Sequence, residues 1–175
     1  MSTPEYSLFL ADAARWVQPE QFADVSEVTP KRLIRLLVNY PSLRAMAWLR
    51  VGAFAHRRGV RGVPNLVKRR IQRVYGLEID PKAPIGGGLY VAHPVGCTLI
   101  VESMGSGVSV MGAVTFGRMQ DERWPRLGDH VFVGAGARVL GPISVGDGAR
   151  IGANAVVISD VPAGATAVGV PARVR

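Results

Sequence analysis

Histidine is the side chain best suited to acid–base chemistry near neutral pH, and His93 lies in the segment VAHPVG. A neutral imidazole can accept the proton of a hydroxyl group while that oxygen attacks an electrophile, and a positioned base is worth roughly 10²–10⁴ in rate. A carboxylate on the other ring nitrogen would fix the tautomer and stabilise the imidazolium. An isolated histidine is more often structural than catalytic. A catalytic role for His93 therefore depends on the elements that position it.

The segment 127–157 carries a branched apolar residue at every sixth position: Leu127, Val133, Val139, Val145, Ile151 and Val157. A fixed period indicates a repeat architecture, in which each unit buries its apolar face by stacking on its neighbours. Three such hexads would make one triangular coil, with small residues at the corners. A β-sandwich with glycine turns is the alternative, and it is disfavoured because strand alternation gives a period of two.

Upstream of this segment the period is looser. Two groups keep the sixfold spacing: Ile85, Val91 and Cys97, then Val108 and Val114. One coil between the groups is expected to be a residue short, with Cys97 as a small buried apolar residue. The passage GRMQDERWP is charged and non-repetitive, so we expect a loop at 117–125 that leaves the coil. Loops on a rigid scaffold often carry function.

Residues 1–75 are predicted to form an α-helical domain, and residues 76–175 the solenoid. Apolar spacing of i, i+3, i+4 and i+7 predicts helix over 30–58, interrupted at Pro41, with Ser42 as N-cap of the second half. A further helix is expected from Pro64 to Tyr75 and should end at a glycine. The first 29 residues give only a weak helical pattern.

The net charge of +8 lies entirely in the helical part, where 13 Lys and Arg face 5 Asp and Glu. Such asymmetry can indicate nucleic acid or a membrane surface as partner. Here the basic residues alternate with Leu, Val and Trp that recur at the spacing of a buried helix face, and they do not cluster with aromatic residues that could stack on bases. This pattern favours a basic helix face exposed to solvent. We therefore expect no nucleic acid partner and do not favour peripheral membrane contact. The polar start and the arginines within the most apolar helix predict a cytoplasmic protein.

The hexad pattern resembles the hexapeptide-repeat acyltransferases, and in particular the serine O-acetyltransferase family with its exopolysaccharide-type relatives. The likeness runs from LLVNYPSLRAMAWLRVGAFAHRRG through GLEIDPKAPIGGGLYVAHPVG and VTFG to DVPAGATAVGVPARV. It implies a mainly-β fold, a left-handed parallel β-helix preceded by a small α-helical segment. It also implies a homotrimer, and leaves open whether trimers pair through the helices.

The resemblance also implies a site. In the family, a histidine at the place of His93 is the general base on the acceptor hydroxyl, and a carboxylate at the place of Glu78 orients it. Acetyl-CoA, the co-substrate, is expected in an outer groove between two subunits, its pantetheine arm near small residues and its phosphates near arginines: Gly117, Ala135, Ala153, Arg150 and Arg173. No metal is expected.

The departures from the family lie on the acceptor side. Ala92 stands where the family has Asp, Trp124 where it has His, and Asp80 where it has a second His, so Arg123 alone remains to bind a carboxylate. A serine zwitterion needs a partner for each of its two charges. An indole is better suited to the apolar face of a sugar ring, although Trp124 could instead plug the loop against the β-helix. The substitutions favour a sugar, glycan or other small hydroxylated metabolite as acceptor, with serine as the alternative.

Two other classes of function fit the sequence less well. A β-helix carbonic anhydrase would need three histidine ligands for zinc, and His56, one of only three histidines, falls in the helical segment. A non-catalytic hexapeptide-repeat scaffold would explain substitutions in the loop, but the chain keeps both Glu78 and His93. The acceptor and the length of the acyl group stay open from the sequence.

Overall fold

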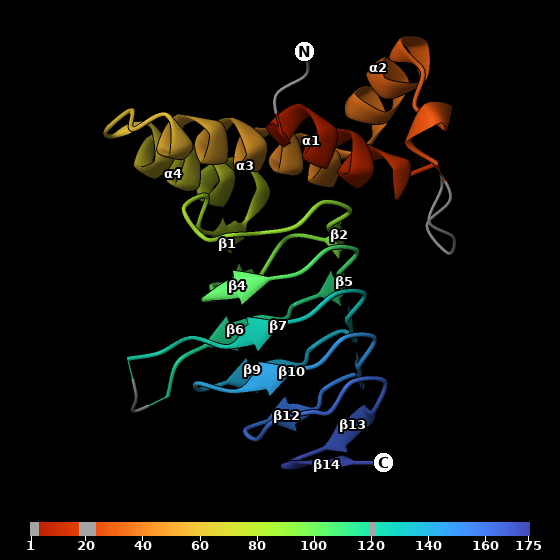
Figure 1. Cartoon of the computed structure of the whole chain (residues 1–175), viewed down its shortest axis with the longest axis vertical. Coiled ribbons are helices and arrows are strands. Elements are labelled where there is room, and N and C mark those ends of the chain that lie inside the picture. Colours follow the sequence, from red (N-terminus) through yellow and green to blue (C-terminus); the bar gives the residue numbers. More distant parts are fainter. Residues whose placement is uncertain (1–3, 18–23, 120–121) are drawn as a thin grey trace.

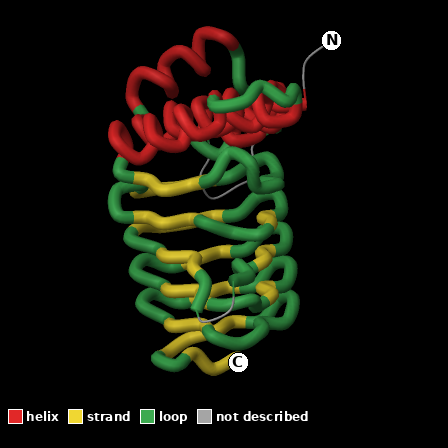
Figure 2. The backbone as a smooth tube through the Cα atoms, turned by 90° about the vertical axis from the view of Figure 1, so that its left-hand side faces the viewer, coloured by secondary structure: helices red, strands yellow, loops and turns green. Residues whose placement is uncertain are grey.

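The computed structural model describes residues 4–17, 24–119 and 122–175. Helices occupy one end of the molecule, and a stack of coils extends from them to the C-terminus (Figures 1 and 2). The helical elements are α1 (Pro4–Ala14), the 3-10 turn η1 (Val25–Glu27), α2 (Pro30–Asn39), α3 (Pro41–Arg57) and α4 (Val63–Tyr75). Among the described residues, no helix is both long and apolar enough to span a bilayer.

The helix boundaries follow local signals, with one correction. α4 ends at Gly76, which takes the left-handed conformation at φ 64° that glycine adopts easily. The prediction of Ser42 as an N-cap is wrong, because α3 begins at Pro41 and its N-cap is Tyr40. Proline suits the first helical position, where its missing N–H costs nothing. Ser42 lies inside the helix, buried, and its hydroxyl donates to the Ala92 carbonyl at 3.4 Å.

The strands are short and follow one another through the whole second part of the chain. They are β1 (Leu77–Ile79), β2 (Tyr90–His93), β3 (Cys97–Leu99), β4 (Ser103–Met104), β5 (Ser109–Gly112), β6 (Thr115–Gly117), β7 (Arg126–Leu127), β8 (Phe132–Val133), β9 (Arg138–Leu140), β10 (Ser144–Val145), β11 (Arg150–Ile151), β12 (Val156–Val157), β13 (Thr166–Gly169) and β14 (Ala172–Val174).

These strands form three sheets that run along the stack, in the orders β1-β3-β6-β9-β12, β10-β7-β4 and β14-β13-β11-β8-β5-β2. All strand pairs are parallel except the closing pair β13 and β14. In the regular part, Leu127 pairs with Val145 and Val133 with Ile151, so one coil is three hexads long. The predicted solenoid is confirmed, and the sixfold apolar positions lie in its core.

Upstream, Ile85 and Val91 lie in the expected register, opposite Met104 and Val110, but from Cys97 through Val114 the expected positions are wrong by two residues. The positions that stack on Leu127, Val133 and Val139 are Met104, Val110 and Phe116, and Leu99 precedes them. The turn at 94–96 between β2 and β3 lengthens that coil and shifts the register. Because residues i and i+2 of a strand face the same side, Cys97, Val108 and Val114 are also buried. Burial raises the pKa of the Cys97 thiol.

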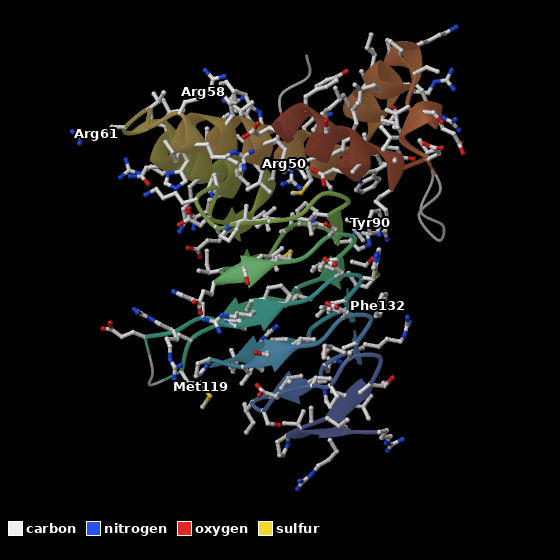
Figure 3. The ribbon with its side chains drawn as sticks, viewed as in Figure 1. Arg50, Arg58, Arg61, Tyr90, Met119 and Phe132 are labelled. Atoms are coloured by element: carbon white, nitrogen blue, oxygen red, sulfur yellow. The ribbon has the colours of Figure 1, made fainter. Side chains whose placement is uncertain are left out.

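A buried ion pair joins the helices to the first coil. The Arg50 guanidinium contacts Asp12 twice, with Nε 2.8 Å from Oδ2 and Nη2 2.9 Å from Oδ1. It also donates to the carbonyls of Ile85 at 2.8 Å and Gly86 at 2.6 Å, and the Leu89 amide donates to Asp12. Burial raises the pKa of Asp12, while Arg50 and the amide oppose that shift. Arg50 thus lies between the helices and the stack (Figure 3), and fixes α1 and α3 to the coil that carries β1 and β2.

A second set of contacts holds the end of α1 to the side of the β-helix. Arg15 donates to the Gly107 carbonyl at 3.0 Å and to the Ser109 hydroxyl at 2.8 Å. Trp16 packs between Tyr40 and Tyr90, with both pairs of ring centroids 4.7 Å apart. The helical part is therefore anchored on two successive coils.

Candidate active site

His93 is the last residue of β2, at the corner where the chain turns from one sheet to the next. Val91 of the same strand is buried in the core, whereas His93 is exposed because the chain turns outward at Pro94. Its register partner on the coil below is Gly112, and its carbonyl accepts from the Cys97 thiol at 3.3 Å. The imidazole therefore stands on a rigid strand end and is open to solvent.

Glu78 lies on β1, half-buried, on the first strand of the neighbouring sheet. The Gly96 amide donates to the Gly76 carbonyl at 3.0 Å, so the turn after His93 lies against the start of β1. The Glu78 carboxylate is 3.4 Å from Lys68 Nζ of α4. Within the ranges that the structure describes, no hydrogen bond joins Glu78 to His93, and the predicted pairing stays a prediction.

Lys68 was not singled out from the sequence. The signal that could have found it is its place beside Val67, on the helix face whose residues Val67, Ile71 and Tyr75 are buried against the first coil. A basic residue next to that stripe is placed near the junction of α4 and β1, the strand that carries Glu78. Its charge therefore reaches the predicted site from the helical part of the molecule.

Two of the predicted cofactor residues lie along the same corner as His93. The Gly136 amide donates to the Gly112 carbonyl at 2.8 Å, and the Asn154 amide to the Ala135 carbonyl at 2.8 Å. The corner therefore descends from His93 past Ala135 to Ala153, one coil at a time. Both alanines are exposed, so their small side chains leave the backbone of the corner accessible.

The other predicted cofactor residues are distributed more widely. Gly117 ends β6, at the opposite end of its strand from the corner that carries His93. Arg150 begins β11 and is exposed, and its guanidinium lies 4.6 Å from the centroid of the ring of Phe132, which Figure 3 labels. Arg173 is exposed on β14, at the C-terminal end of the stack. One chain alone does not bring Gly117 and Arg173 to His93.

The expected loop leaves the stack between Gly117, the end of β6, and Arg126, the start of β7 (Figure 1). Residues 120 and 121 lie outside the described residues. Trp124 is half-buried, and the Arg118 guanidinium lies 5.3 Å from the centroid of its ring. Arg123 is exposed. The indole is thus held within the loop by a cation–π contact, a partner that the sequence did not indicate.

The remaining acceptor-side residues have local partners. Ala92 is half-buried and its carbonyl accepts from Ser42, so the backbone of the strand end is tied to α3. Asp80 is half-buried, and its Oδ1 accepts from the Lys82 amide at 2.9 Å. This is an Asx-type turn, which the aspartate closes at the start of the coil. Among the described residues, no group of three or more His, Cys, Asp or Glu is placed to hold a metal ion.

Comparison with known proteins shows the family and the fold of this chain. The family model for bacterial transferase hexapeptide (six repeats) matches residues 125–159. A serine acetyltransferase of Helicobacter pylori is 40% identical over 142 residues, which cover 79% of this chain and 83% of that one. The soybean serine acetyltransferase complexed with serine superposes with a TM-score of 0.81 at 35% identity, over 98% of this chain and 69% of that chain.

A serine acetyltransferase in complex with CoA superposes with a TM-score of 0.80 at 30% identity, over 98% of this chain and 69% of that one. The likeness covers the helices as well as the β-helix, and therefore exceeds what a shared repeat alone would give. The chain belongs to the serine acetyltransferase family of hexapeptide-repeat acyltransferases and is an O-acetyltransferase.

Proposed function

We propose that this O-acetyltransferase transfers the acetyl group of acetyl-CoA to the side-chain hydroxyl of serine, with His93 as general base. The observation that carries the proposal is the family likeness over nearly the whole chain. It is supported by His93 and Glu78, which stand where the sequence motifs resemble those that carry the family's base and its carboxylate. Solved structures that the chain resembles hold serine in one case and CoA in another. This replaces a sugar as the first choice of acceptor.

The chemistry needs a base because a neutral hydroxyl is a weak nucleophile toward a thioester. In the proposed step, the His93 imidazole accepts the hydroxyl proton while the serine oxygen forms its bond to the acetyl carbon. The C–S bond then breaks, and the imidazolium returns the proton to the departing CoA thiolate. Glu78 is the proposed positioning residue for the ring, and Lys68 keeps that carboxylate at the junction of α4 and β1.

Acetyl-CoA would run along the corner that descends from His93 past Ala135 and Ala153. Exposed backbone beside small side chains lets a pantetheine arm approach closely and exchange hydrogen bonds with main-chain groups. Gly117 lies away from this corner within one chain, so it would line the groove from a neighbouring subunit of a trimer. Arg150 and Arg173 are the proposed partners of the CoA phosphates.

A sugar or glycan hydroxyl is the second candidate acceptor, and two observations favour it. Ala92 supplies no carboxylate beside His93, and Trp124 presents an indole where the family has a histidine. An aromatic ring covers the apolar face of a sugar, whereas the serine ammonium would lose one partner.

Thiol release from acetyl-CoA, followed with a chromogenic disulfide, separates the two candidates. Serine should give at least tenfold higher kcat/KM than any member of a panel of sugars and nucleotide-sugars, with O-acetylserine identified by mass spectrometry. Faster turnover of a sugar would make the second candidate the function. If neither serine nor any sugar or nucleotide-sugar caused thiol release, the proposed reaction would be contradicted. In the variant Ala92→Asp with Trp124→His, serine turnover should rise if those two positions limit it.

A further inference from the structure

We propose that Ser42 and Gly112 are positioning residues that clamp His93 from two sides, one from the helical part and one from the coil below. The inference rests on the proposed role of His93 and adds the residues that hold it. It starts from the observation that the exposed imidazole stands at a strand end, where the ladder of the sheet holds it on one side only.

The lower side of the clamp is the bare Cα of Gly112. This glycine is buried and pairs with His93 in the parallel register of β2 and β5. A Cβ added to it would lie 3.1 Å from His93 Cβ and 3.7 Å from the ring atom Cδ2. A side chain here would press on the Cβ of His93 and displace the imidazole that it carries, so the bare Cα of Gly112 allows His93 to keep its place in the strand.

The upper side of the clamp is Ser42 of α3. Its side chain is buried, and its hydroxyl donates to the carbonyl of Ala92, the residue directly before His93, at 3.4 Å. α3 is itself fixed to the first coil by Arg50, which donates to the carbonyls of Ile85 and Gly86. Ser42 therefore transmits the position of a rigid helix to the backbone of the strand end.

A general base is sensitive to such support because proton transfer needs the ring within hydrogen-bond reach of the acceptor hydroxyl. A displacement of 1 Å can cost about 10²-fold in rate, so a few tenths of an ångström should cost several-fold. The binding of acetyl-CoA does not depend on the imidazole angle. The clamp should therefore act on kcat and leave the KM for acetyl-CoA alone.

Gly112→Ala is expected to lower kcat about tenfold with the KM for acetyl-CoA unchanged within about twofold. The matched control is Gly87→Ala, where an added Cβ would be equally tight, 3.1 Å from Ala11 Cβ and 3.1 Å from Leu8 Cδ2, but remote from His93. That control should keep the activity of the parent chain. Equal losses in both variants, or a folded Gly112→Ala enzyme with full kcat, would overturn the role of Gly112.

Ser42→Ala removes one hydroxyl without adding volume, so it tests the clamp even if Gly112→Ala does not fold. It should lower kcat about threefold, in line with the loss of one hydrogen bond, again with an unchanged KM for acetyl-CoA. The control Ser109→Ala removes another hydroxyl that links the helical part to β5, where it accepts from Arg15 at 2.8 Å, and should keep kcat. Ser42→Ala with the kcat of the parent chain would refute the upper side of the clamp.

A spectroscopic measurement separates the clamp from the proposed function. The chain has three histidines, so three imidazole Cε1–H signals are expected, and His93→Ala identifies one of them. Gly112→Ala and Ser42→Ala should shift the His93 signal and leave those of His56 and His130 in place. Unmoved His93 signals in both variants would disprove the clamp whether or not the enzyme acetylates serine. An enzyme inactive on serine with a shifted His93 signal would disprove only the proposed acceptor.

Discussion

His93 is the residue on which the proposed reaction depends, and its exposure at a strand end agrees with that use. His93→Ala removes the proton acceptor and leaves the corner with Ala135 and Ala153 intact. We expect kcat to fall at least about 10²-fold, while the affinity for acetyl-CoA, measured by calorimetry, stays nearly the same. Full activity in this variant would assign the base to another group.

Substitution of Glu78 should lower kcat less than substitution of His93. Glu78→Gln removes the charge but keeps the shape, and it leaves Lys68 Nζ without its partner 3.4 Å away. Since the base survives with a poorer orientation, kcat should fall less than in His93→Ala, by about tenfold. Steady-state kinetics of the two variants, measured under the same conditions, show which one loses more kcat. A larger loss in Glu78→Gln would mean that the carboxylate does more than position the ring.

At the scale of elements, the buried pair of Asp12 and Arg50 joins α1 and α3 to the first coil. Removing one partner leaves a charge buried without compensation, so Asp12→Asn or Arg50→Met should each lower the free energy of unfolding by about 3–5 kcal/mol. The double variant should lose less than the sum of the two. Urea unfolding of all four proteins measures both quantities.

A surface pair provides the control for that comparison. Arg126 Nη2 lies 2.6 Å from Glu102 Oε1, but the side chains are 58% and 44% exposed. Arg126→Met should therefore change the free energy of unfolding by no more than about 1 kcal/mol. A loss as large as that of Arg50→Met would show that burial is not the cause of the difference.

The loop between β6 and β7 is the other element with a role to test. If the half-buried Trp124 covers the acceptor, Trp124→Ala should raise the KM for the acceptor by the equivalent of about 1–3 kcal/mol. The affinity for acetyl-CoA should stay unchanged. Arg118→Met removes the cation that lies over the indole and should reproduce part of this effect. A lowered thermal midpoint with both substrates affected alike would instead show that Trp124 only fastens the loop.

At the scale of the whole molecule, the distribution of the proposed cofactor residues, together with the family resemblance, predicts a trimer. His93, Ala135 and Ala153 share one corner, whereas Gly117 lies at the other end of its strand. A groove that uses all four needs two chains, and a closed symmetric assembly provides that groove to every chain; the family resemblance makes three the expected number of subunits. Sedimentation equilibrium should give a mass three times the 18.7 kDa of one chain. A stable monomer with full activity would contradict this assembly.

The sequence by itself determined the features that depend on local or repeating patterns. Six apolar residues at sixfold spacing specify the coil, because each must be buried and each coil can bury them only against the next. The end of α4 at Gly76 follows from the backbone freedom of glycine. His93 in VAHPVG, with Glu78 upstream, was enough to predict a site, because the motif carries the resemblance, and the roles of both residues stay predictions.

Only the tertiary structure decided which distant residues meet. The turn at 94–96 shifts the upstream register by two residues, and no sixfold count reveals this because both i and i+2 positions are apolar there. Ser42 looked like a helix cap until the structure placed it on the Ala92 carbonyl. Asp12 and Arg50 pair across 38 positions of chain. Such contacts depend on how whole helices dock on a coil, and the shape of that interface is not encoded in the local spacing of either partner.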